Sequence, residues 1–497
     1  MASRWSQHQV LDRRCRAERG SRFVTGGPPV AMLYPSPYRA GMSSLGYQWM
    51  IALLQDAGFG VERAFLPDDE GAAGDQILTY ETRTPLAHFP VIAVSLAYEL
   101  ELAGLVRALT LAGVPPLRED RGPHHPRVLL GGPLTFSNPL PAAPFVDGML
   151  LGEADETVLP AIGGALDRGR EAWLDLIEAL PGGYVPERHG SRLPPVAKAG
   201  DALLPARSRI LAPEAELSDM FLIEGERGCH RACTFCVMRR STNGGMRLVT
   251  PDAILSYVPD EARRVGLVGA AISDHPQLVG LLERLVESGR EVGVSSLRAD
   301  RVALKPDIPR LLRLGGYKTL TVASDAASQR LRRAMSKGTT EPHLLACAEA
   351  ARAHSYKVLK VYMMIGVPDE TDADIDELIE FSRKLAAIHP VALGIAPFVP
   401  KRNTPLDGAS FAGIKVVEAR LARLAAGLRR TQVEIRPTSA RWAWVEAQLA
   451  QGGPEAGLAV KTAVEAGGGF SAWRAALGSV APEAAAPWRA AGEAAVR

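Results

Sequence analysis

Short apolar runs alternate with helical patterns from about residue 29 onward. The run PVAMLYPSP (29–37) is typical of a buried strand, and residues 42–58 follow it with apolar positions spaced three and four apart, as in a helix. Further apolar runs lie at 60–67, 91–98, 127–134 and 145–153, with a second helical pattern at 99–113. Strands separated by such crossovers predict a parallel sheet with helices on both faces. Residues 29–165 are therefore expected to form a Rossmann-like α/β domain.

A second alternation begins near residue 219 and predicts six strand–helix units. The candidate strands lie at 219–228, 265–273, 291–299, 319–326, 357–366 and 391–400. The helical patterns between them lie at 250–264, 276–290, 307–315, 340–355 and 370–388. Six units make a partial version of the eight-unit TIM-type barrel, whose active site lies at the carboxyl ends of the strands. We expect a partial (β/α)6 barrel at residues 216–410.

Three other segments lack this alternation. Residues 1–28 are polar and rich in arginine, and we expect an N-terminal tail there. Residues 166–215 are rich in proline and weakly periodic, which favours a linker between domains. Residues 411–497 are rich in alanine and dotted with arginine, which favours a helical C-terminal extension.

Composition narrows the class of protein. A chain of 497 residues exceeds what one core usually supports, so more than one domain is expected. The net charge of +2 makes nucleic acid an unlikely partner, and no uncharged apolar run is long enough to span a bilayer. The N-terminus has no apolar segment of the secretory kind, so we expect a cytoplasmic protein with no membrane contact. Five cysteines in such a chain favour metal binding or redox chemistry over disulfides.

Three of the five cysteines fall within eight positions, directly after the first strand of the predicted barrel. Cys229, Cys233 and Cys236 have the spacing C-x3-C-x2-C. A structural zinc site needs four ligands, usually in two separated pairs, and electron-transfer iron–sulfur clusters use four cysteines. Three thiolates on a four-iron cube leave one iron open, and an open position is typical of catalytic metal sites. A zinc site that includes His230 and a chance grouping are the alternatives.

The motif C-x3-C-x-aromatic-C, with Phe235 before the third cysteine, resembles that of the radical S-adenosylmethionine (SAM) superfamily. The resemblance implies a [4Fe–4S] cluster held by the three cysteines, whose free iron chelates the amino and carboxylate groups of SAM. It further implies reductive cleavage of SAM to a 5′-deoxyadenosyl radical that abstracts hydrogen. The electron would come from a cellular donor of the flavodoxin or ferredoxin type.

Two later segments of the predicted barrel are similar to SAM-binding segments of this superfamily. The turn GLVGAAISDHP, with Gly269, resembles the turn that holds the SAM amino group, where the backbone must approach closely. Ser296 and Arg298 end the third strand, and a guanidinium such as that of Arg298 can grip a carboxylate. The alternative for Arg298 is a salt bridge with Asp300. Asp325 stands where close relatives usually carry glutamate, so no role is carried over to it.

The N-terminal domain extends the resemblance. Motifs such as YPSPYRAGMSSLGYQ and SLAYELE resemble those of radical SAM proteins with an N-terminal cobalamin-binding-type (B12) domain, and the similarity runs from about 29 to 475. The resemblance implies corrin-binding candidates at strand ends: Ser95, Tyr98, Glu99, Gly131, Gly132 and Gly152. An ordinary strand-to-helix turn is the alternative for the paired glycines. A helix cap is the alternative for the tyrosine and the glutamate.

None of the ten histidines lies in the Asp-x-His-x-x-Gly motif that supplies a lower cobalt ligand. Either cobalamin binds without a protein histidine, or the domain has kept its shape and lost the ligand. Cys347 lies in a helical pattern and is expected to be a small buried apolar residue, whereas Cys15 lies in the polar tail and is expected to be incidental.

The sequence thus predicts a radical SAM enzyme that performs cobalamin-dependent methyl transfer, or a related radical reaction, on a small-molecule or peptidyl substrate. A cobalamin-free radical enzyme that catalyses a rearrangement or cyclisation is the first alternative. Methylthiolation is disfavoured, because no second set of three cysteines is present for an auxiliary cluster. A non-catalytic iron–sulfur protein is the second alternative, and it would be marked by a fourth cluster ligand.

Overall fold

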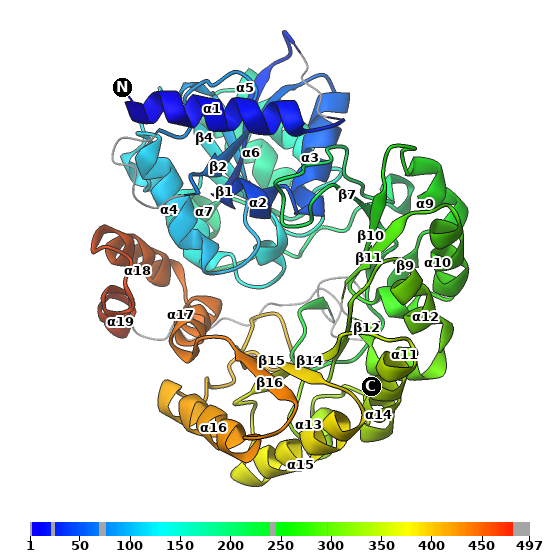
Figure 1. Cartoon of the computed structure of the whole chain (residues 1–497). Coiled ribbons are helices and arrows are strands. Elements are labelled where there is room, and N and C mark those ends of the chain that lie inside the picture. Colours follow the sequence, from blue (N-terminus) through cyan, green and yellow to red (C-terminus); the bar gives the residue numbers. More distant parts are fainter. Residues whose placement is uncertain (1, 21–24, 69–75, 239–244, 296, 481–497) are drawn as a thin grey trace. The chain divides into compact units, whose positions relative to one another are not determined.

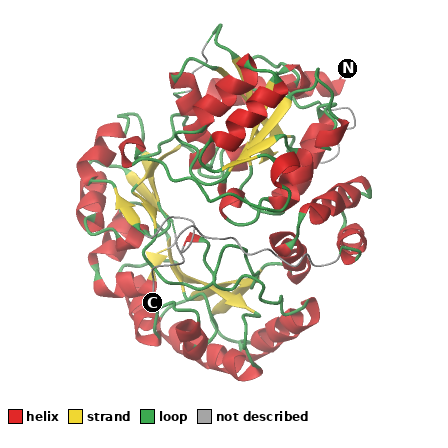
Figure 2. Ribbon diagram, turned by 180° about the vertical axis from the view of Figure 1, so that it is seen from behind, coloured by secondary structure: helices red, strands yellow, loops and turns green. Residues whose placement is uncertain are grey.

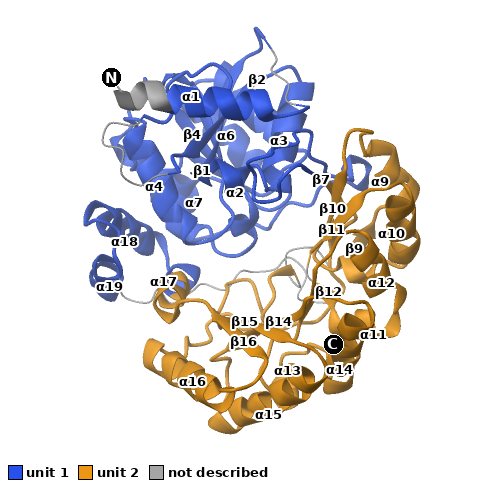
Figure 3. Ribbon diagram, in the orientation of Figure 1, with its two compact units in different colours: residues 1–221, 448–497 blue, residues 222–447 orange. Residues whose placement is uncertain are grey.

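The computed structural model describes residues 2–20, 25–68, 76–238, 245–295 and 297–480, with side chains from residue 7 onward. The chain forms two compact units, residues 1–221 with 448–497 and residues 222–447 (Figure 3). Within the described ranges, no helix combines the length and the apolar character that a membrane crossing requires.

The first unit is built on a sheet with the strand order β2-β1-β3-β4-β5-β6. Strands β1 to β5 run parallel to their neighbours, and β6 is antiparallel to β5. The bounds are β1 (Pro29–Pro37), β2 (Gly60–Leu66), β3 (Val91–Ser95), β4 (Arg127–Gly131), β5 (Gly148–Leu150) and β6 (Gly183–Tyr184). The parallel sheet predicted from the apolar runs is confirmed, since each predicted run contains one of the first five strands.

Helices cover both faces of this sheet (Figure 2). Helix α3 begins after Ser44, whose hydroxyl accepts a hydrogen bond from the Tyr47 amide, and its apolar side buries Tyr47, Ile51 and Leu54 in the core. The helices of the unit are α1 (Ala2–Ala17), α2 (Tyr38–Gly41), α3 (Leu45–Asp56), α4 (Glu101–Leu111), α5 (Val158–Asp167), α6 (Arg170–Ala179), α7 (Pro186–His189), α18 (Pro454–Glu465) and α19 (Phe470–Gly478). Helix α17 (Ala440–Gln451) runs from the second unit into the first.

The polar segment 1–28, expected as an N-terminal tail, contains helix α1. Glu18, just beyond this helix, is buried against Arg63 of β2, and its carboxylate accepts hydrogen bonds of 2.7 and 2.8 Å from the two terminal nitrogens of that guanidinium. Cys15 is half-buried, and its thiol donates to the Tyr80 carbonyl at 3.2 Å. Ion pairing rather than an apolar stripe fixes this segment, so hydrophobic periodicity gave no sign of it.

Residues 166–215, expected as a linker, contain helix α6 and strand β6. Trp173, Leu174 and Ile177 of α6 are fully buried. The prolines that suggested a linker lie after this helix, so they hid a short amphipathic element whose apolar residues recur at three- and four-residue intervals.

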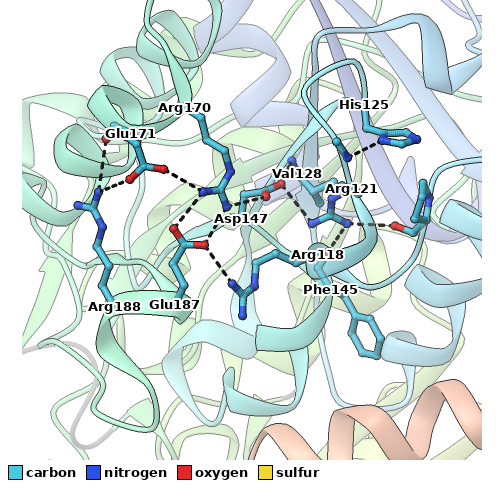
Figure 4. A network of polar contacts seen from close by, with 12 residues as sticks. Arg118, Arg121, His125, Val128, Phe145, Asp147, Arg170, Glu171, Glu187 and Arg188 are labelled. Atoms are coloured by element: carbon cyan, nitrogen blue, oxygen red, sulfur yellow. Dashed lines mark hydrogen bonds and ion pairs between the residues drawn. The ribbon is translucent and has the colours of Figure 1, made fainter.

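Asp147 joins several of these elements at the edge of the sheet where β4 begins (Figure 4). Its carboxylate accepts a hydrogen bond of 2.8 Å from the Val128 amide and lies 3.2 Å from Arg121 and 3.6 Å from Arg170. The Asp147 and Arg121 side chains are 7% and 3% exposed. Arg121 also donates to the Phe145 carbonyl at 3.1 Å, so the pair fixes the segment directly before β5.

Asp147→Asn is expected to lower the free energy of unfolding by about 3 kcal/mol, because it leaves the buried Arg121 guanidinium without its counter-charge. Guanidinium denaturation followed by circular dichroism measures the change. Asp175→Asn is the matched control, since Asp175 is 70% exposed and pairs with Arg188 at the surface. Equal stability of the two variants would contradict the role assigned to Asp147.

The second unit contains two parallel sheets. Strands β7 (Met220–Glu224), β10 (Arg264–Val268) and β11 (Glu291–Val294) form one sheet in the order β11-β10-β7. The other sheet has β12 (Leu297–Arg298), β13 (Thr319–Ala323), β14 (Val358–Ile365), β15 (Val391–Pro397) and β16 (Val433–Pro437), in chain order. The predicted third strand contains both β11 and β12, and Ser296, which lies in the sequence between them, is outside the described residues. The strand order follows the chain, as it does in a (β/α) barrel.

Helices line one side of these strands (Figure 1). They are α9 (Pro251–Tyr257), α10 (Leu278–Glu287), α11 (Ala299–Leu304), α12 (Asp307–Leu314), α13 (Gln329–Ala334), α14 (Glu341–Ala353), α15 (Asp372–Ile388) and α16 (Ile414–Gly427). Short 3-10 helices lie at Leu86–His88, Arg118–Asp120, Pro133–Phe136, Leu140–Phe145 and Asp201–Leu203 in the first unit and at Ile272–Asp274 in the second. All six predicted strands are present, and β16 is an additional one.

Candidate active site

The three clustered cysteines face one cavity of about 430 Å³ in the second unit. They follow strand β8 (Glu226–Gly228), which pairs with β9 (Met246–Leu248) next to the end of β7. Cys233 is buried, whereas Cys229 and Cys236 are half-buried. The remaining lining comes from the cysteine loop itself, from strands and from the segments that follow them: Arg231, Phe235, Ala270, Ala271, Leu297, Arg298, Ala323, Asp325, Lys337 and Tyr362. The fold therefore brings the predicted residues Phe235 and Arg298 to the same cavity as the cysteines.

Backbone hydrogen bonds hold the cysteine loop in place. The Thr234 amide donates to the Met335 carbonyl at 3.1 Å, and the Thr234 carbonyl accepts from the Leu406 amide at 3.2 Å. The Cys233 thiol lies 3.9 Å from the Ser336 carbonyl, and the Arg231 amide donates to Cys229 Sγ at 3.4 Å. An amide that donates to sulfur stabilises a thiolate, which is the form that binds metals.

Asp274 binds an arginine of the cysteine loop through its buried carboxylate. Its side chain is fully buried and accepts hydrogen bonds of 2.7 and 2.5 Å from Arg231 and of 2.5 Å from Arg301 of α11. Burial raises the pKa of Asp274, but the hydrogen bonds from the two arginines outweigh it and lower the pKa to about 2. One carboxylate thus ties the segment between Cys229 and Cys233 to the turn after β10.

Burial favours the neutral thiol over the thiolate at two of the three cysteines. Burial raises the pKa of Cys229, and it raises the pKa of Cys236 to about 11. Among the described residues, no group of three or more His, Cys, Asp and Glu side chains is arranged to hold a single metal ion. The cysteines share a cavity, and a positive group placed in it would favour their thiolates.

Arg298 lines the cavity but is already paired. Its Nε atom lies 3.0 Å from an Asp300 carboxylate oxygen, and its Nη2 atom donates to the Lys337 carbonyl at 3.0 Å. The Arg298 amide donates to the Ser273 hydroxyl at 3.2 Å, so the end of β12 is joined to the turn after β10. The salt bridge that the sequence offered as the alternative for Arg298 is therefore present in the structure.

Gly269 leaves room for a protein side chain. A Cβ atom on this residue would lie 2.4 Å from Oε1 of Glu226, and that oxygen accepts a hydrogen bond of 2.6 Å from the Ala271 amide. Burial raises the pKa of Glu226 to about 7. The close approach predicted at this turn is thus made by a carboxyl group of β8, and Ala270 and Ala271 are the turn residues that reach the cavity.

Three residues that line the cavity, Asp325, Lys337 and Tyr362, were not predicted as site residues from the sequence. The buried Lys337 ammonium pairs with Asp325, which has a left-handed backbone with φ of 62°. Tyr362 of β14 is 39% exposed although it lies on an inner strand of its sheet. Alternation along β14 placed this tyrosine opposite the helix-covered residues, which is the signal that could have identified it.

A second cavity, of about 620 Å³, lies at the carboxyl ends of β1 and β3 in the first unit. Between these two strands the sheet order changes direction, which is where open α/β sheets bind ligands. Tyr98 contributes to the wall and is 45% exposed. Glu101 accepts hydrogen bonds from the Ser36 hydroxyl at 3.0 Å and from the Ala97 amide at 2.7 Å, and burial raises its pKa. Glu101 was not among the predicted site residues.

The other predicted residues of the first unit lie outside the wall of this cavity. Ser95 and Glu99 are buried, and Gly131 pairs with Ser95 across β3 and β4. Gly132 has φ of 103°, and a Cβ atom there would lie 2.7 Å from the backbone of Leu96. Gly152, with φ of 96°, lies against the backbone of Ala197, at 2.6 Å from the corresponding Cβ position. The close backbone neighbours explain why glycine occupies both positions, and at Gly132 this agrees with the ordinary-turn alternative given for the paired glycines.

Two family models match the chain. The model described as radical SAM proteins, N-terminal, matches residues 46–186, and the model described as radical SAM superfamily matches residues 223–382. The second match includes the three cysteines and the turn after β10. The chain belongs to the radical SAM superfamily. The resemblance inferred from the cysteine spacing is confirmed, and the protein is a radical SAM enzyme.

The relatives of this radical SAM enzyme that follow each match about three quarters of the chain. An uncharacterised protein of Methanocaldococcus jannaschii is 27% identical over 399 residues, which cover 77% of this chain and 80% of the relative. The radical SAM methyltransferase TsrM from Kitasatospora setae, solved with cobalamin and a [4Fe–4S] cluster, has a TM-score of 0.57 and 13% identity, with 79% of this chain and 78% of TsrM covered. A second TsrM structure, with tryptophan and a SAM analogue, has a TM-score of 0.54 and 14% identity, with 76% and 75% covered. The radical SAM enzyme therefore has a similar overall α/β fold.

Proposed function

We propose that this radical SAM enzyme holds a [4Fe–4S] cluster on Cys229, Cys233 and Cys236 and cleaves SAM reductively. We further propose that it uses cobalamin for methyl transfer, or a related radical reaction, on a small-molecule or peptidyl substrate. The observation that carries the proposal is the presence of three thiols, with no fourth cysteine and no histidine, among the described residues that line one cavity. A four-iron cube fits such a donor set, because each thiolate binds a different iron and the three need not converge on one ion.

When bound, such a cluster supplies an open iron that chelates SAM and the electron that cleaves it to methionine and a 5′-deoxyadenosyl radical. The chain's own part is to bind and orient SAM. Arg298, held in place by Asp300 and the Lys337 carbonyl, would present its guanidinium to the SAM carboxylate. The backbone of Ala270 and Ala271 would meet the amino group, because no large side chain of that turn enters the cavity.

The cavity of the first unit supports the cobalamin part of the proposal. It lies at the change in strand order, and the fold is similar to that of an enzyme solved with cobalamin. Ser36, Tyr98 and Glu101 would hold the corrin through its polar side groups and its flat face. The lining contains no histidine, so cobalt would bind here without a histidine ligand from this wall.

Anaerobic reconstitution with iron, sulfide and cobalamin tests both parts. Incubation with SAM and dithionite is expected to release 5′-deoxyadenosine, and corrin absorption bands are expected to stay with the protein through gel filtration. Dithionite here replaces the flavodoxin- or ferredoxin-type donor that we propose for the cell. Release of 5′-deoxyadenosine without retained corrin would favour the cobalamin-free alternative. Absence of 5′-deoxyadenosine from iron-loaded protein would contradict the radical reaction itself.

Tyr98→Ala is expected to weaken cobalamin binding about tenfold, because it removes an aromatic face from the cavity wall. Equilibrium titration of the apoprotein with cobalamin, followed by absorption, gives the dissociation constant, and the iron content of the variant is expected to stay at the wild-type level. Tyr257→Ala on α9 is the control, since Tyr257 is similarly exposed at 41% but lies in the second unit. A Tyr98→Ala protein with unchanged affinity would place cobalamin elsewhere.

A further inference from the structure

The face of β13–β16 that turns away from the helices carries a row of side chains in register. Ala323, Tyr362, Gly394 and Arg436 are paired in turn across the four strands. On β14 the alternate residues Leu359, Val361 and Met363 are buried, whereas Tyr362 is 39% exposed. Because alternate residues of a strand point to opposite faces, Tyr362 and Lys360 share the open face.

Gly394 shapes this face by lacking a side chain. A Cβ atom there would lie 2.8 Å from Cδ1 of the Tyr362 ring and 3.4 Å from Cε of Lys360. The Lys360 ammonium lies 4.5 Å from the centre of the Tyr362 ring and 2.8 Å from its hydroxyl. Lys360, Tyr362 and Gly394, called here the Lys360 platform, therefore form an aromatic surface with a fixed positive charge beside it.

The platform is continuous with the cysteine cavity, because Tyr362 lines that cavity together with the three cysteines. Each charged side chain of the cavity wall has a partner of opposite charge: Arg231 pairs with Asp274, Arg298 with Asp300 and Lys337 with Asp325. Arg436, next to the platform, pairs with Glu434. Among the described residues, Lys360 has no carboxylate within 4 Å, and its polar partner is the Tyr362 hydroxyl.

We propose that the Lys360 platform is the substrate subsite of the proposed radical reaction, and that it binds a molecule with a planar or apolar part and an acidic group. The planar part lies against the Tyr362 ring, and the acidic group, a carboxylate or a phosphate, pairs with the Lys360 ammonium. This inference rests on the proposed function, since the shared cavity is what places such a substrate beside the cluster cysteines. A half-buried ammonium without a carboxylate partner attracts an anionic ligand more strongly than one in bulk water, because the surrounding protein lowers the effective dielectric and the pair forms a charge-assisted hydrogen bond.

Probe binding to the iron-loaded enzyme with SAM, without reductant, tests the platform. Benzoate and its neutral counterpart benzamide differ in charge but not in ring, and phenyl phosphate replaces the carboxylate by phosphate. Dissociation constants from ligand-observed NMR are expected to favour benzoate over benzamide by about tenfold, the size of one charge-assisted hydrogen bond. The order of benzoate and phenyl phosphate then identifies the acidic group.

Lys360→Met is expected to reduce the benzoate preference to about onefold, whereas Lys360→Arg, which keeps the charge, is expected to retain it. Lys384→Met on the exposed side of α15 is the matched control. Three results would overturn the proposal for the platform: equal binding of benzoate and benzamide by the wild type, no binding of either probe, or a preference for benzoate that persists in Lys360→Met.

Iron content and 5′-deoxyadenosine, measured on the same preparations, separate the two proposals. A preference without SAM cleavage contradicts only the radical reaction, and cleavage without a preference contradicts only the platform.

Discussion

Cys233→Ala is expected to remove the iron from this enzyme and to lower 5′-deoxyadenosine formation by at least about 100-fold. Cys233 is the most buried of the three cysteines, and the hydrogen bonds of Thr234 to Met335 and Leu406 fix its position in the loop. With two thiolates left, the cavity has no further cysteine or histidine among its described lining residues to take over the vacant ligand position. Residues that act as one unit fail together, so a partial effect is not expected.

The measurement is iron and sulfide per chain after anaerobic reconstitution, with 5′-deoxyadenosine determined on the same samples. Cys347→Ala is the control, because Cys347 is fully buried outside the cavity and its thiol donates to the Ala299 carbonyl at 3.6 Å. Burial raises the pKa of Cys347, so its thiol stays uncharged. This agrees with the prediction that Cys347 is a small buried apolar residue. Wild-type iron in Cys233→Ala would contradict the ligand assignment.

Asp274→Asn is expected to accelerate loss of the cluster, although Asp274 touches none of the cysteines in the contacts described above. Asparagine keeps the shape but not the charge that holds Arg231 and Arg301 together. The arginine side chains are 25% and 30% exposed, so water partly replaces the lost pairing. We therefore expect the substitution to lower the free energy that holds the cysteine loop closed by about 2 kcal/mol, a small value for the loss of a buried carboxylate. If the loop opens before iron leaves, this corresponds to iron release that is faster by about 30-fold.

Iron release to an external chelator, followed by absorption after mixing, measures this rate. Asp252→Asn is the control, since Asp252 is 87% exposed and pairs with Arg284 on the outside of the second unit. The control is expected to release iron at the wild-type rate, because exposed pairs contribute little. Asp274→Asn with a wild-type release rate would show that the loop is held by its backbone hydrogen bonds alone.

Most strands of the two units could be predicted from the sequence, because their apolar residues form short runs that are buried in the fold. Residues 29–37 were expected as a strand and form β1 over the same range. The cysteine spacing, read with Phe235, likewise predicted the superfamily, because those residues are adjacent in sequence. A sequence pattern predicts a structural feature when the residues that form the feature are adjacent in sequence.

Interactions between distant residues could not be predicted in this way. Arg231 and Asp274 are 43 positions apart, and nothing in either segment marks them as partners. Strand β16 was missed because VEIRP alternates with charged residues, which reads as an exposed segment. Glu226 lies against Gly269, and neither segment marks the two residues, 43 positions apart, as neighbours. Each case depends on which elements become neighbours in the fold.

The central claim is that three thiolates bind a four-iron cube and leave one iron for SAM. Mössbauer spectroscopy of 57Fe-reconstituted enzyme, recorded before and after addition of SAM, tests it most directly. The account predicts a [4Fe–4S] spectrum in which one iron of the four changes its parameters when SAM binds. Four irons that stay unchanged in the presence of saturating SAM would contradict it.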